Sequence, residues 1–166
     1  MDAYVVGLRA VHIVAAASWV GASLSFAFFI EPVANRLGPS ASQFMIELTE
    51  RRKFPVAIAV VSVLAIVAGM LLYWRDSSGL EWAWISTRTG AMFTAGAVAA
   101  LSAWLVGFLI LRPGIARTAA LAAAAPTDPT AQDELARLGH RLRTASLVNA
   151  WLIILATLAM ATARYV

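Results

Sequence analysis

The 166-residue sequence contains no cysteine, which excludes disulfides, thiolate metal sites, iron–sulfur clusters and haem attachment through CxxCH. Charge is also scarce, since 13% of the residues are charged, whereas a soluble domain has about 25%. No GxSxG, HExxH or glycine-rich phosphate loop occurs, and no apolar segment carries a pair of carboxylates. These absences argue against a proton-driven carrier and leave open whether the chain is an enzyme.

Apolar residues make up 61% of the chain and lie in long blocks. A helix needs about 20 mostly apolar residues to cross a bilayer. The blocks predict an all-α fold, an integral membrane four-helix bundle forming a single transmembrane domain over 1–166, with helices at about 4–30, 55–74, 88–111 and 146–163. The first and third helices are expected to end at Glu31-Pro32 and Arg112-Pro113, because proline disfavours helical geometry in the residue before it. A break is predicted at 121–130.

Basic residues are distributed unevenly between the two sides of this bundle. Nine of the 13 lie in the connections 31–54 and 112–145, and the other four are Arg9, Arg75, Arg88 and Arg164. The positive-inside rule therefore predicts that both termini lie on the outer face. It also places amphipathic helices before the second and fourth spans in the cytoplasm. We expect a multi-pass protein of a bacterial-type inner (plasma) membrane, with the lipid bilayer as its partner and no nucleic acid.

The residues with metal chemistry lie in the outer half of the predicted spans. His12 is about eight residues into the first helix, which is roughly 12 Å along its axis. Met70, Met92 and Met160 each lie four residues from the outer end of the second, third and fourth helices. An ionisable residue inside a membrane helix is a functional hypothesis.

Two cofactors would use these residues. A haem takes an imidazole as an axial ligand, with methionine as a common second ligand, which predicts His12 with Met92 or Met70. Arg9 and Arg88 would then meet the propionates. Alternatively, His12 with Met70, Met92 and Met160 would suit Cu(I), because thioethers are soft ligands. Trp19 shares a face with His12 and would form a wall of either site.

Structural roles are the competing interpretation. A histidine can hydrogen-bond a neighbouring helix, and methionine fills irregular gaps. Asn149 is expected to hydrogen-bond between helices. Small residues recur at every fourth position, as in Ala17, Gly21 and Ser25 or in Ala65 and Gly69, and such stripes let helices approach closely in lipid. They predict a homo-oligomer, or a non-catalytic accessory or assembly subunit of a larger membrane complex.

The first helix, LRAVHIVAAASWVGASLSF, resembles that of the small four-helix membrane proteins of the HemJ/CopD-like group, through His12, Trp19 and Gly21. ERRKFP at 50–55 and the segment from Trp84 to Arg88 are also similar. Resemblance to HemJ implies a redox-linked haem b protein with His12 as the haem ligand, and hence a haem-dependent membrane oxidoreductase. Arg88 stands where that pattern has a lysine, and a guanidinium is a very poor metal ligand. Resemblance to CopD implies copper binding or transport.

Overall fold

The computed structural model describes residues 2–124 and 128–166, and nearly all of them are helical. Four helices in these ranges are long and apolar enough to cross a membrane, which confirms the prediction of an all-α protein with four spans. The spans are built from α1 (Ala3–Ser25) continued by α2 (Glu31–Leu37), α4 (Phe54–Asp76), α6 (Arg88–Val106) continued by α7 (Arg112–Ala124), and α8 (Pro129–Thr162). Two short helices, α3 (Ser42–Ile46) and α5 (Trp82–Ile85), lie in connections.

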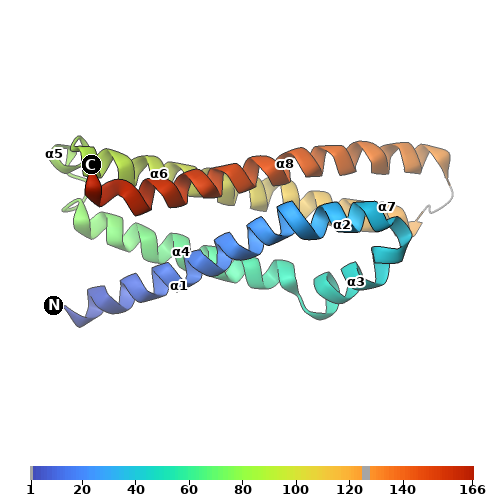
Figure 1. The fold of residues 1–166 in the computed structure, drawn as a ribbon, viewed down its shortest axis with the longest axis horizontal. Helices are drawn as coiled ribbons and strands as arrows, with labels where there is room; N and C mark the ends of the chain where they lie inside the picture. Colours follow the sequence, from blue (N-terminus) through green and yellow to red (C-terminus); the bar gives the residue numbers. More distant parts are fainter. Residues whose placement is uncertain (1, 125–127) are drawn as a thin grey trace.

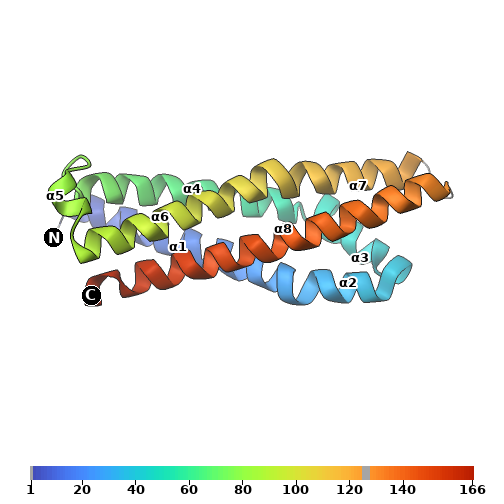
Figure 2. The same ribbon diagram turned by 90° about the horizontal axis from the view of Figure 1, so that it is seen from above.

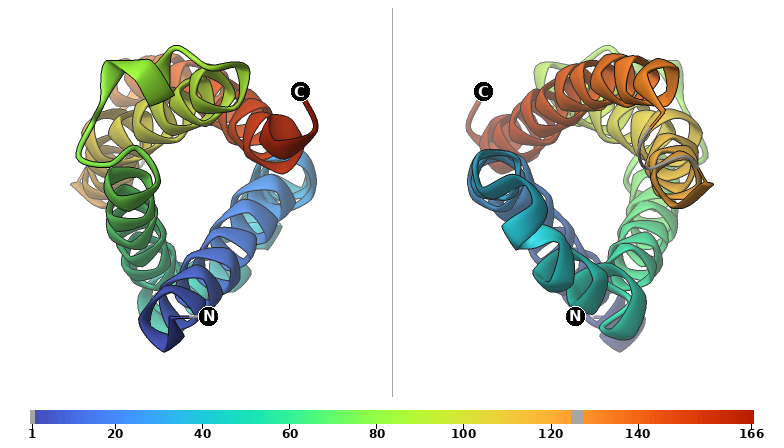
Figure 3. Two further views of the ribbon diagram at one scale, coloured as in Figure 1. Left: turned by 90° about the vertical axis from the view of Figure 1, so that its left-hand side faces the viewer. Right: turned by 90° about the vertical axis from the view of Figure 1, so that its right-hand side faces the viewer.

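The four spans form two helical hairpins, α1 with α4 and α6 with α8 (Figure 1). Both chain ends and α5 lie at one end of the bundle, and α2, α3 and α7 lie at the other (Figures 1 and 2). We call these the tryptophan end and the basic end. Seen along the bundle, α1 lies beside α4 and α8, and α6 completes the ring (Figure 3).

The two hairpins meet in a small apolar cluster at the centre of the bundle. The cluster contains one or two buried residues from each span, namely Ala15, Trp19, Ala65, Ala103 and Ile153. Three of these five are alanines on α4, α6 and α1, so the helices approach closely around one large ring. Such packing suits a membrane, where small residues and van der Waals contact hold helices together.

The expected helix ends at Glu31-Pro32 and Arg112-Pro113 are wrong, because both helices continue through the proline. In each case a five-residue π-helical segment precedes the proline, over Phe26–Ile30 and Gly107–Leu111. Proline has no N–H and its ring clashes with the carbonyl four residues earlier. The wider π-turn accommodates this: the N–H of Glu31 bonds to Phe26 O, five residues back, and that of Arg112 bonds to Gly107 O.

This π-turn leaves the carbonyl of Ala27 without a partner in its own helix. The N–H four residues on is bonded to Phe26, and the residue five on is Pro32, which has none. The guanidinium of Arg143, on α8, donates to Ala27 O and also pairs with Glu31 at 3.0 Å. The Arg143 side chain is 33% exposed and that of Glu31 14%, so the pair is sheltered and links the two hairpins.

The other helix bounds differ less from those predicted. The fourth span begins at Pro129 and includes the polar helix expected before it. In the predicted break at 121–130, Leu121 to Ala124 are helical, whereas residues 125–127 lie outside the described residues. The segment before the second span forms α3 and a further π-turn, Glu47–Arg51, in which Glu47 pairs with Arg51 at 3.5 Å.

Candidate functional site

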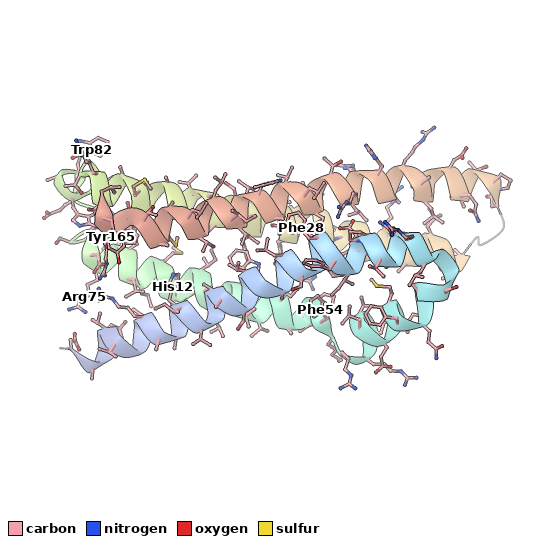
Figure 4. The ribbon with its side chains drawn as sticks, in the orientation of Figure 1. His12, Phe28, Phe54, Arg75, Trp82 and Tyr165 are labelled. Atoms are coloured by element: carbon pink, nitrogen blue, oxygen red, sulfur yellow. The ribbon has the colours of Figure 1, made fainter. Side chains whose placement is uncertain are left out.

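His12 lies between α1 and α4, near the tryptophan end (Figure 4). Its Nδ1 is 2.8 Å from the backbone carbonyl oxygen of Ala65, on α4. A carbonyl can only accept, so Nδ1 carries the proton and donates. The imidazole is partly buried, and this bond holds the ring in one orientation.

Gly69 makes this hydrogen bond sterically accessible. In an α-helix the carbonyl of residue 65 already accepts from the N–H of residue 69. The imidazole therefore reaches the second lone pair of that oxygen by passing over Gly69. A Cβ at position 69 would lie 2.8 Å from His12 Cε1 and 3.0 Å from Nδ1, which is too close. The small pair Ala65 and Gly69 thus admits a side chain from α1.

The tautomer determines what the other ring nitrogen can do. With the proton on Nδ1, Nε2 of a neutral imidazole has a free lone pair and can accept a hydrogen bond or bind a metal ion. Histidines that bind metals almost always donate their other N–H to a carbonyl, a carboxylate or water, because this fixes the ring and raises its basicity. His12 and Ala65 have this arrangement.

Trp19 shares a helix with His12 but belongs to the centre of the bundle. The residue is 7% exposed and packs in the apolar cluster with Ala65 and Ile153. The indole therefore contributes to the contact between the hairpins. It lies seven residues beyond His12, about 10 Å along the axis.

The three methionines occupy three different environments. Met70 follows Gly69 on α4 and is 60% exposed on the outer surface of the bundle. Met160 packs in the other hairpin, where its Cγ would be 2.9 Å from a Cβ on Gly96. Met92 is half-buried on α6. Met70 is thus directed to the outer surface of the bundle, and Met160 packs against Gly96 on α6.

The two arginines predicted near the rim lie at the tryptophan end. Arg9 is 3.9 Å from the carboxylate of Asp76 on α4, and nearby Arg75 is 3.6 Å from Asp2. These largely exposed pairs link α1 and α4 at the tryptophan end, and each contributes about 1 kcal/mol or less. Arg88 is exposed at the first position of α6.

Asn149 differs from its expected role. It is 8% exposed on α8, and its Oδ1 has no hydrogen-bond partner among the residues of 2–124 and 128–166. The predicted hydrogen bond between helices is therefore not made by this oxygen. A buried acceptor without a partner is costly and would be satisfied by water or a ligand donor in the interior. In the sequence, the only indication that Asn149 is unusual is its polar amide within an apolar segment.

No family model matches the chain, and no curated protein sequence or solved structure matches it either. The findings therefore identify a four-span membrane protein without identifying a family. The resemblance carried by His12, Trp19 and Gly21 stays a prediction.

Proposed function

We propose that this chain is a small integral membrane protein that binds haem b through His12 and takes part in electron transfer. The observation that supports it is the hydrogen bond from His12 Nδ1 to Ala65 O, 2.8 Å long. That bond leaves Nε2 as the nitrogen with a free lone pair, and a neutral imidazole nitrogen is what haem iron takes as an axial ligand.

The surrounding residues fit a haem in part. His12 Nε2 would hold the iron, Arg9 and Arg88 at the tryptophan end would meet the propionates, and Trp19 would bound the site on its deeper side. Met92 is the better second ligand of the two proposed, since Met70 is 60% exposed. When bound, the haem would supply one-electron chemistry, whereas the hydrogen bond from His12 to Ala65 O orients the ligand.

A copper site draws less support from the same geometry. It needs several soft ligands around one ion, whereas Met70 is exposed and Met160 packs against Gly96 in the other hairpin. Copper handling and an accessory role in a larger complex are therefore kept as alternatives, which the experiment below distinguishes from haem binding.

The test is the visible spectrum of the detergent-purified protein, oxidised and reduced, before and after addition of haem. His12→Ala is compared with His140→Ala, which removes the other histidine from an exposed position on α8. We expect a Soret band in the native protein and in His140→Ala, and none in His12→Ala. Gly69→Ala should shift or weaken the band, because it displaces the imidazole.

The alternatives give different results. A native protein that shows no Soret band even with added haem would refute the haem proposal, and so would an unchanged band in His12→Ala. Retention of Cu(I) that falls when Met92 or Met160 is replaced would favour copper. Stable co-purification with a second membrane protein, unaffected by His12→Ala, would favour an accessory subunit.

A further inference from the structure

A groove runs along the seam between α6 and α8 at the basic end, far from His12. Its volume is about 430 Å³, within the range of about 300–1,000 Å³ typical of ligand sites. Val106 and Ile110 line one wall, and His140, Arg141, Thr144 and Val148 line the other. We call it the basic-end groove.

The lining of the groove is mostly apolar, and Arg141 borders it toward one end of its α8 wall. Val148 and Arg141 are seven residues apart on α8, which is about 10 Å. Val106 and Ile110, one turn apart, supply apolar side chains on the opposite wall. A molecule that fits must therefore have an apolar part directed toward the middle of the bundle and an anionic part toward the basic end.

Arg141 provides a charge that the protein does not neutralise. At this end Arg117 pairs with Glu134 and Arg143 with Glu31, whereas Arg137 on the same helix forms no ion pair with any residue that the structure describes. Arg141 is exposed and forms no ion pair within residues 2–124 and 128–166. A guanidinium stays protonated and matches the geometry of a phosphate, to which it can donate two hydrogen bonds.

We propose that the basic-end groove binds an anionic phospholipid from the leaflet at that end. The phosphate would lie at Arg141, beside His140 and Thr144, and one acyl chain would lie along Val106, Ile110 and Val148. Val148 is 46% exposed, so the groove opens on the outer surface of a bundle whose spans are apolar. Basic grooves between membrane helices bind lipid headgroups by this combination of contacts. The proposal does not depend on the proposed haem function.

The experiment measures binding of phosphatidylglycerol to the full-length protein in detergent by native mass spectrometry, with phosphatidylcholine for comparison. Arg141→Gln is matched by Arg137→Gln, the same charge change one turn away on α8 and outside the groove. Loss of one charge-assisted contact should weaken phosphatidylglycerol binding roughly tenfold in Arg141→Gln and little in Arg137→Gln. Val148→Trp, which fills the apolar part, should also weaken binding, whereas Leu155→Trp at another exposed position on α8 should not.

Three results would overturn the proposal. Equal losses in Arg141→Gln and Arg137→Gln would mean that the overall charge of this end attracts the lipid. Unchanged binding in both Arg141→Gln and Val148→Trp would mean that no lipid occupies the groove. Displacement of the lipid by millimolar glycerol 3-phosphate would mean that the site recognises a soluble phosphate.

Discussion

Replacing Gly69 by alanine tests whether the His12 imidazole lies over this glycine. The added methyl would be 2.8 Å from Cε1 and 3.0 Å from Nδ1 of His12, so the ring must move and the bond to Ala65 O must lengthen or break. Gly21→Ala is the matched control, because nothing lies within 4 Å of the Cβ position there.

The expected magnitude combines three contributions. Overpacking costs about 1–3 kcal/mol, and a hydrogen bond between membrane helices contributes about 0.6 kcal/mol. Alanine in place of glycine favours a helix by about 1 kcal/mol. Gly69→Ala should therefore lower the free energy of unfolding by about 1–2 kcal/mol. Gly21→Ala should leave it unchanged or raise it.

A double-mutant cycle with His12→Ala isolates the contact. Without the imidazole the methyl at position 69 meets no clash, so Gly69→Ala should be neutral or stabilising in the His12→Ala background. The coupling between the two positions should be about 2 kcal/mol. Reversible unfolding in mixed detergent micelles measures all four proteins. Equal effects of Gly69→Ala in both backgrounds would show that the imidazole does not lie over position 69, and would refute the reasoning.

Two further predictions use the same unfolding measurement. Arg143→Gln should destabilise the protein by about 2 kcal/mol, because it leaves the Ala27 carbonyl and the Glu31 carboxylate without their charged partner. Glu31→Gln should cost less, since the bond to Ala27 survives; equal costs would contradict this account. Gly90→Ala should cost about 3 kcal/mol, at the upper end for overpacking, because the new Cβ would be 2.1 Å from the backbone oxygen of Trp84, which cannot rotate away. A Gly90→Ala protein as stable as the native one would show that this close approach is absent.

The four spans could be predicted from the sequence because an apolar run of sufficient length has few alternatives in a bilayer. The sequence did not predict, however, that the first and third spans continue as helices past Pro32 and Pro113. At Pro32 the helix continues because a π-turn precedes the proline and accommodates its lack of an N–H. The carbonyl of Ala27, which this turn leaves without a helical partner, accepts a hydrogen bond from Arg143. Arg143 is 116 residues from Ala27 in the sequence, so no local sequence pattern could predict that its guanidinium would bond to this carbonyl.

The sequence predicted how far along its helix each candidate residue lies, but not which side of the helix it occupies. Position along the helices placed His12 and Met70 at similar depth, yet successive residues of an α-helix point about 100° apart. Because Gly69 faces His12, the next residue, Met70, faces outward. The pair Ala65 and Gly69 correctly indicated a close approach. The group that approaches is the His12 ring, which donates a hydrogen bond to a backbone carbonyl. Because every residue has a backbone carbonyl, the sequence does not show which one accepts.

The two hairpins use one packing device with different residues, and the difference bears on the role of His12. In the α6–α8 hairpin, a Cβ on Gly96 would be 2.9 Å from Met160 Cγ and 3.3 Å from Ala156 O. Methionine thus fills the space beside a glycine without the cost of a polar ring in the membrane. Packing alone therefore does not require an imidazole over Gly69. The hydrogen bond to α4 involves only Nδ1 of the imidazole. Neither this bond nor the packing against Gly69 involves the lone pair of Nε2, and this lone pair is what the proposed haem function requires.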